Sequence, residues 1–172
     1  WIWERGKKPR LDKIPKKIKV IKRIKEFINI NNLDGYIIPK NDHYFTEYSK
    51  INNLARVTKF TGSAGFALIL KKKNYLFVDG RYTIQAKKQA GDAFNILEIP
   101  YIWPKNLSFL YNHKIGFDPK LFTRKTLEKY FENKFNLVPI SFNFKNKIEN
   151  KFIKAYNLKN SVTGESSISK IN

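Results

Sequence analysis

The stretch from residue 66 to residue 78, Phe66-Ala67-Leu68-Ile69-Leu70-Lys71-Lys72-Lys73-Asn74-Tyr75-Leu76-Phe77-Val78, decides the fold. Two apolar runs, 66–70 and 75–78, stand on either side of a short charged segment. Short apolar runs bounded by polar residues are typical of buried strands, and a connection of four residues joins strands that pair side by side. The stretch therefore predicts a β-hairpin with a charged tip.

The segments on either side of the hairpin alternate between helix and strand patterns. Isoleucines spaced by three and four positions predict an amphipathic helix over residues 14–31. The other expected strands are short apolar runs, and the other expected helices carry apolar residues on one side. Strands are expected at 35–38, 94–99, 114–117 and 137–140, and helices at 81–90, from Thr123 onward and at 148–156, with a helical turn or two within 44–48. This order predicts an α/β fold, a mixed β-sheet with helices on both faces.

A glycine-rich segment, Thr61-Gly62-Ser63-Ala64-Gly65, leads into the hairpin. A serine between glycines occurs in the nucleophile elbow of hydrolases, but that motif needs a strand before it and a helix after it. Here a strand follows, and the Gly-Lys-Ser/Thr of a phosphate loop is missing. We interpret the segment as a tight turn whose glycines adopt dihedral angles that other residues disfavour.

The composition excludes several classes of site. Cysteine is absent, so disulfides, thiolate catalysis and thiolate metal sites are excluded. His43 and His113, the two histidines, lie far apart in the chain, so we expect no metal centre and no catalytic residue. A stretch of 18 apolar residues and a secretory signal are both missing, which favours a cytoplasmic protein without a membrane partner.

The net charge of +20 has two readings. Only a few of the 34 basic residues are arginine, and the lysines are spread along the chain together with much Asn, Ile, Phe and Tyr. Codons rich in A and T encode these residues, so genome composition explains the excess, and we expect no specific nucleic-acid partner. Weak, salt-sensitive binding of a polyanion is the alternative.

Three regions are expected along the chain. Residues 1–13 lack periodicity and are interpreted as a basic, disordered flank. Residues 14–156 hold the folded domain, and residues 157–172, rich in Ser, Asn and Gly, look like a linker. The absence of methionine, even at position 1, favours a fragment or a processed product.

Asp79-Gly80-Arg81-Tyr82 is the most promising cluster for chemistry. Asp79 leaves a strand and can cap the amides of the following helix. Arg81 then projects near the carboxyl end of that strand, where α/β sheets usually offer clefts, and its guanidinium fork could grip a ligand carboxylate or carbonyl. On physical grounds alone, a structural ion pair of Arg81 with Asp42 or Asp79 is equally expected.

Several segments in register resemble one known family. They are Asp34-Gly35-Tyr36-Ile37-Ile38-Pro39, Asp42 with Glu47-Tyr48, 60–65, 78–82 with Gln85-Ala86, 115–119 and 163–171. In this order and spacing the chain resembles, over residues 18–172, the N-terminal domain of aminopeptidase P, an Xaa-Pro aminopeptidase of the creatinase/prolidase family.

The resemblance implies a ribonuclease H-like α/β domain that shapes substrate access and dimer contacts. The full-length enzymes release an N-terminal residue that precedes proline, with two divalent metals, usually manganese, held in a C-terminal domain that this chain lacks. The family's peptide-contacting arginine matches Arg81, and Asp42 is expected to support substrate binding. At the position where many relatives carry a histidine, this chain has Tyr44, so the resemblance implies no role for His43. Residues 157–172 would then begin a truncated second domain.

The sequence thus supports a non-catalytic N-terminal domain of an Xaa-Pro aminopeptidase-like metallopeptidase, with no cofactor of its own. Its expected partners are the peptide substrate, the protein's own C-terminal domains and a second subunit. The alternative is a free-standing binding or scaffold module from a truncated gene.

Overall fold

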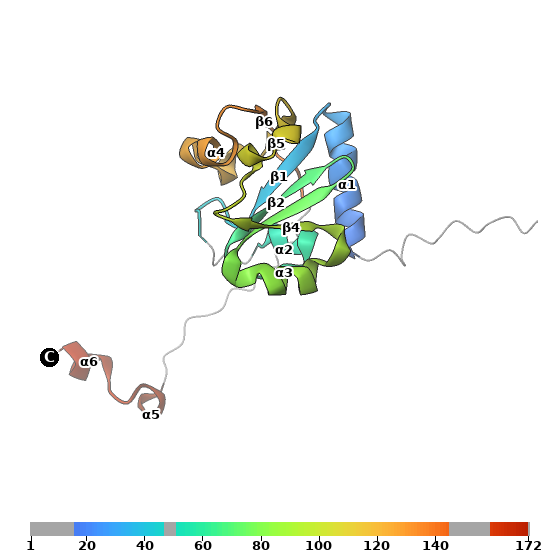
Figure 1. The fold of residues 1–172 in the computed structure, drawn as a ribbon. Coiled ribbons are helices and arrows are strands. Elements are labelled where there is room, and N and C mark those ends of the chain that lie inside the picture. Colours follow the sequence, from blue (N-terminus) through green and yellow to red (C-terminus); the bar gives the residue numbers. More distant parts are fainter. Residues whose placement is uncertain (1–15, 47–50, 145–158, 172) are drawn as a thin grey trace, which may run out of the picture.

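The computed structural model describes residues 16–46, 51–144 and 159–171. Its sheet has six strands in the order β4-β3-β2-β1-β5-β6 (Figure 1). The strands are β1 Gly35–Pro39, β2 Gly65–Leu70, β3 Asn74–Asp79, β4 Asn95–Ile99, β5 Lys114–Phe117 and β6 Asn136–Pro139. β2 runs antiparallel to β1 and β3, and the other neighbouring pairs are parallel. The mixed α/β sheet expected from the sequence is therefore confirmed.

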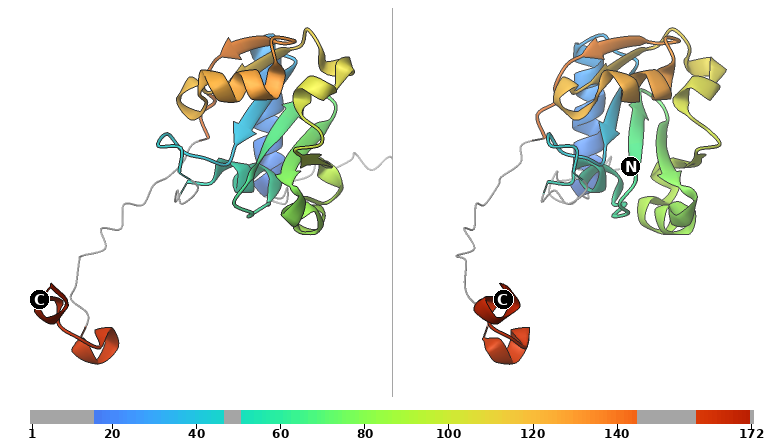
Figure 2. Two further views of the ribbon diagram at one scale, coloured as in Figure 1. Left: turned by 60° about the vertical axis from the view of Figure 1, so that its left-hand side comes forward. Right: turned by 90° about the vertical axis from the view of Figure 1, so that its left-hand side faces the viewer.

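Helices cover both faces of this sheet, as two further views show (Figure 2). The helices are α1 Lys16–Ile30, α2 Asn53–Thr58, α3 Thr83–Ala90, α4 Arg124–Phe131, α5 Asn160–Thr163 and α6 Ser167–Ile171. Buried residues of α1, α2 and α3 join one apolar cluster with the sheet, and Phe131 of α4 joins a second cluster. Thr123 caps α4 by accepting a hydrogen bond from the Thr126 N–H at 3.1 Å, as expected.

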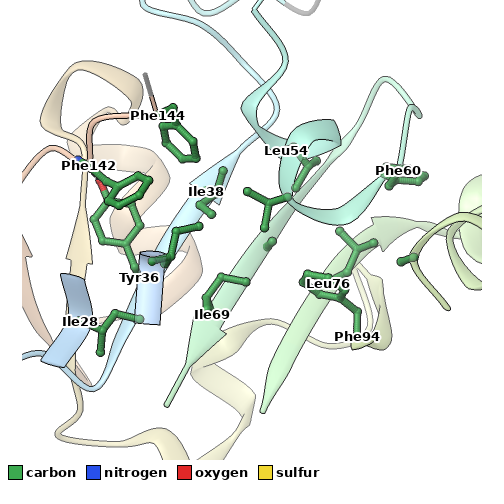
Figure 3. Packing of buried hydrophobic residues seen from close by; sticks show 14 of the residues in the cluster. Ile28, Tyr36, Ile38, Leu54, Phe60, Ile69, Leu76, Phe94, Phe142 and Phe144 are labelled. Atoms are coloured by element: carbon green, nitrogen blue, oxygen red, sulfur yellow. Dashed lines mark hydrogen bonds between the residues drawn. The ribbon is translucent and has the colours of Figure 1, made fainter. Parts of the chain in front are cut away.

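The two clusters form because successive strand residues point to opposite faces. In β1, Tyr36 and Ile38 belong to the cluster under α1 to α3, and Ile37 belongs to the other. The buried strands are apolar at nearly every position because both faces of the sheet are covered. Figure 3 shows Tyr36 and Ile38 among the labelled side chains of the first cluster.

Tyr36 ties β1 to the segment that follows β6. Its hydroxyl donates a hydrogen bond to the Ile140 carbonyl at 2.9 Å and accepts one from the Phe142 N–H at 3.0 Å. The Tyr36 side chain is 1% exposed, and this burial raises the pKa of its phenol. The hydroxyl therefore stays protonated in the folded protein at pH values at which an exposed tyrosine has already lost its proton.

The raised pKa of the Tyr36 hydroxyl predicts how the stability of the domain depends on pH. Because the folded pKa exceeds the unfolded value of about 10, the stabilisation is complete below pH ~10 and is lost as the pH rises through the folded pKa. Tyr36→Phe should lower the free energy of unfolding at pH 7 by about 1–3 kcal/mol, because two buried groups lose their partner. It should also flatten the decline above pH ~10. Urea unfolding at pH 7 and pH 11 checks both, with Tyr44→Phe as control since Tyr44 is 88% exposed. An unchanged slope for Tyr36→Phe would contradict the assignment.

Local expectations were mostly confirmed, with one correction and one omission. A helical turn was expected from residue 44, and for the described residues 44–46 this prediction was wrong. The Tyr44 and Thr46 N–H groups donate to the Asp42 carboxylate instead of forming helical hydrogen bonds. Helix α2 was not expected at all. The expected helix at 148–156 and the start of the first helix lie outside the described residues, as do residues 1–13. The described part of 157–172 contains α5 and α6, and the domain boundaries stay predictions.

Candidate functional site

The motifs singled out in the sequence gather at one edge of the sheet. β1 and β3 point in the same direction because β2 runs antiparallel between them, so Pro39 and Asp79 end at the same edge where β2 begins at Gly65. The loop 40–46, the turn 61–65 and the 3₁₀ turn Gly80–Tyr82 therefore lie at this carboxyl edge. Topology alone thus brings three separate segments into one region.

Arg81 is held there by the residue that ends β3. The Asp79 Oδ1 accepts hydrogen bonds from the Arg81 backbone N–H at 3.0 Å and from Nε at 2.8 Å. The guanidinium and the backbone N–H lower the pKa of the Asp79 carboxyl, so it is ionised at neutral pH. The Arg81 side chain is 73% exposed, so the pair adds little to stability but leaves the guanidinium accessible to a ligand. Of the two acids considered as partners for Arg81, Asp79 forms this ion pair.

Tyr82 connects Arg81 to the glycine-rich turn. The Arg81 Cζ lies 5.4 Å from the centre of the Tyr82 ring, and the Tyr82 hydroxyl lies 2.9 Å from the Ser63 Oγ. The Tyr82 ring also packs edge-on against Phe60 at 5.8 Å. Strand β2, not a helix, follows Ser63, so the serine does not lie on a nucleophile elbow. Its hydroxyl instead links the turn to Tyr82 at the start of α3.

A second set of hydrogen bonds joins the same two segments. The Thr61 N–H donates to the Gln89 Oε1 at 2.9 Å, while Gln85 and Gln89 donate to the Thr61 Oγ1 at 3.1 and 3.0 Å. Gly65 has a φ of +151°, so the turn needs a residue without a side chain, as the sequence indicated. The turn and α3 thus form one unit connected by hydrogen bonds.

Asp42 lies at the same edge, but its carboxylate accepts hydrogen bonds from the backbone of its own loop. Its Oδ1 accepts the N–H groups of Tyr44 and Thr46 at 2.9 and 3.0 Å. The neighbouring Asn41 donates to the Leu121 carbonyl at 3.0 Å, which fixes the loop to the segment after β5. Asp42 therefore shapes the loop, and its role toward a substrate stays a prediction.

Comparison with known proteins identifies the domain. Residues 21–145 match the family model of the Creatinase/Prolidase N-terminal domain. The chain belongs to this family. This creatinase/prolidase N-terminal domain is 32% identical over 116 residues to the "Probable Xaa-Pro aminopeptidase P" of Coprinopsis cinerea, covering 62% of this chain and 18% of the relative. It is 31% identical over 113 residues to the human "Xaa-Pro aminopeptidase 2", covering 62% and 17%. The chain thus spans under a fifth of the length of these curated relatives.

Solved structures show the same fold. An X-prolyl aminopeptidase from Caenorhabditis elegans superposes with a TM-score of 0.61 at 20% identity, covering 74% of this chain and 24% of that one. An N-terminal domain from Corynebacterium diphtheriae, described as creatinase/prolidase-like, gives a TM-score of 0.60 at 17% identity, covering 75% of this chain and 99% of that one. This creatinase/prolidase N-terminal domain therefore shares its overall fold with these structures.

Sequence reasoning missed Glu98 at this edge. Glu98 is half-buried near the end of β4, opposite Val78 of β3, and its carboxylate lies against Gly80 so closely that a Cβ at Gly80 would collide with it. A side chain at position 80 would therefore have to push the flexible Glu98 carboxylate aside. The signal was the single charged residue in the otherwise apolar run 96–99.

The described residues do not fit the two-metal centre that the family implies. Within 16–46, 51–144 and 159–171, no group of three or more His, Asp or Glu side chains converges as metal ligands would. His43 is exposed in the loop after β1, whereas His113 precedes β5 at the opposite edge. We therefore derive no step through a metal from these residues. Among the helices that the structure describes, none is both long and apolar enough to cross a membrane.

Proposed function

We propose that this creatinase/prolidase N-terminal domain is the non-catalytic part of an Xaa-Pro aminopeptidase-like metallopeptidase, which releases an N-terminal residue that precedes proline. The names of the curated relatives support this class of activity. Because the chain covers only 17–18% of those relatives, the activity would belong to a longer protein. In that protein the domain shapes substrate access and contributes to contacts within a homodimer.

The observation that carries the proposal is the placement of Arg81. Its side chain is 73% exposed, and its guanidinium contacts both the Asp79 carboxylate and the Tyr82 ring. A guanidinium fork binds carboxylates and carbonyl oxygens through directed, charge-assisted hydrogen bonds, and both groups occur in a peptide. An arginine held in advance contributes to the reaction by positioning the peptide rather than by breaking bonds.

Other components would lie outside the described residues. Two divalent metals, with manganese expected, would be held by a C-terminal domain and would supply an activated water. Asp42 would keep the loop 40–46 in shape beside the peptide. A cytoplasmic location is proposed with them, since the structural relative from Caenorhabditis elegans is described as a cytosolic enzyme with a di-nuclear active site.

The role of Arg81 is tested by binding of an Arg-Pro-Pro peptide to this chain. Arg81→Ala should weaken the affinity by about tenfold or more, since a lost charge-assisted hydrogen bond costs about 1.5–3 kcal/mol. Arg81→Lys should recover only part of it, because lysine keeps the charge but not the planar fork. Isothermal titration calorimetry measures both.

Arg124→Ala is the matched control for this experiment. Arg124 also pairs through Nε with a carboxylate, Glu128, at 2.8 Å, but it lies on α4 rather than at the carboxyl edge. Its affinity for the peptide should be unchanged. Equal affinity of Arg81→Ala and the unchanged chain would contradict the proposal. So would turnover of the peptide by this chain with manganese above a control without protein.

A further inference from the structure

The opposite edge of the sheet carries a hollow of about 340 Å³. It lies at the hairpin tip between β2 and β3, beside the residues that precede β1 and β5. The residues that line it come from four segments: Asp34, Leu70, Lys71, Lys72, Lys73, Tyr75, Phe109, Leu110 and His113. We call it the hairpin-tip hollow. Because β1 and β3 begin here and end at the Arg81 edge, the two regions lie at opposite ends of the strands.

One wall of the hairpin-tip hollow is aromatic. The rings of Tyr75 and Phe109 lie 6.1 Å apart at a tilt of 42°. Tyr75 is 7% exposed and Leu110 is fully buried, so both are fixed by the core. Phe109, in contrast, is 57% exposed. Its ring is therefore open to a planar ligand.

The rim of the hollow is cationic. Its acid, Asp34, is bound by the Lys71 ammonium at 3.1 Å and by the Lys114 N–H at 2.9 Å. Burial raises the pKa of Asp34, but the hydrogen bonds from Lys114 and Lys71 outweigh it and lower the pKa, so its charge is present and already paired. Lys72 and Lys73 are exposed, and neither forms an ion pair with any acid that the structure describes. Two lysines thus stand beside an open aromatic ring.

We propose that the hairpin-tip hollow binds single-stranded nucleic acid, with a base against Phe109 and phosphates on Lys72 and Lys73. A cationic rim next to an exposed aromatic ring is the combination that single-strand binding requires, because every base has a stacking face and the backbone is anionic. An acidic peptide would use the lysines but leave the aromatic wall unused. The sequence alone offered no reason to expect a specific nucleic-acid partner, and it is the hollow that changes this expectation. The net charge of +20 attracts a polyanion in general, and the lysines and the ring of the hollow give it a place to dock.

Fluorescence anisotropy with a labelled oligothymidine of about 12 nucleotides tests this at ~0.15 M salt. The double variant Lys72→Glu/Lys73→Glu should bind at least about tenfold more weakly, because two phosphate contacts become repulsive. Phe109→Ala should weaken binding by about fivefold or more, as expected for the loss of one stacked base. Lys87→Glu/Lys88→Glu, with the same charge change on the exposed side of α3, should lose less than about threefold.

Several results would overturn the proposal. These are equal losses for the two lysine pairs, an unchanged affinity for Phe109→Ala, or binding too weak to measure at this salt concentration. A polyglutamate peptide that binds as tightly would assign the surface to acidic peptides, and free thymidine monophosphate that binds as tightly would assign it to nucleotides. Circular dichroism first checks that each variant folds, and Lys72→Ala/Lys73→Ala replaces the glutamate pair if it does not. This experiment leaves Arg81 unchanged, so its outcome is independent of the peptide proposal.

Discussion

Replacing Phe77 by alanine is expected to lower the free energy of unfolding by about 3–5 kcal/mol. Phe77 lies in the middle of β3, is fully buried and stacks on Phe66 of β2 with ring centres 4.6 Å apart and nearly parallel planes. Phe66 in turn stacks on Tyr130 of α4 at 4.3 Å, so the ring of Phe77 supports the whole layer on that face. Alanine would leave a cavity that the surrounding rings can only partly fill.

Equilibrium urea unfolding measures this loss. Phe109→Ala serves as the control, because Phe109 carries the same side chain on the same face but is 57% exposed, and it should cost about 1 kcal/mol or less. A loss for Phe77→Ala no larger than that of the control would show that the aromatic layer does not hold the sheet to α4.

Gly65→Ala should destabilise the domain by about 3–5 kcal/mol. Two causes act together at this position. The φ of +151° is one that other residues rarely adopt, and a Cβ would lie 2.7 Å from the Phe77 carbonyl oxygen. That oxygen belongs to the backbone of β3 and cannot move without disturbing the hairpin. Since Gly65 is the last residue of the turn 61–65, this turn should be displaced as well.

Gly91→Ala separates the two causes. Gly91, at the end of α3, also has a positive φ, +59°, but a Cβ there would meet nothing within 4 Å. It should therefore cost only the backbone strain, about 1–3 kcal/mol. Thermal unfolding of both variants gives the comparison, and similar losses at the two positions would mean that the contact with Phe77 is unimportant.

Features that depend on a few neighbouring residues could be predicted. The hairpin was expected from two apolar runs and a charged tip, and β2 and β3 match it to within one residue at each end. The cap at Asp79 involves the Arg81 N–H, only two positions away. Helix α2 was not predicted because its six residues make less than two turns, too few for a periodic pattern. Its buried Leu54 and Val57 are held in place by contacts with other elements.

The amino-acid sequence by itself determined the order of the strands and of the longer helices, the hairpin, and the presence of Arg81 after a strand. Spacing and residue type over a few positions specify these features. Only the tertiary structure decided which side chains meet. Ser63 meets Tyr82 across 19 positions, and the Phe142 N–H reaches Tyr36 across 106. The hairpin-tip hollow likewise joins Lys72 to Phe109. Any polar or aromatic side chain has many possible partners in a sequence, and only the paired sheet selects one by bringing distant segments to the same edge or face.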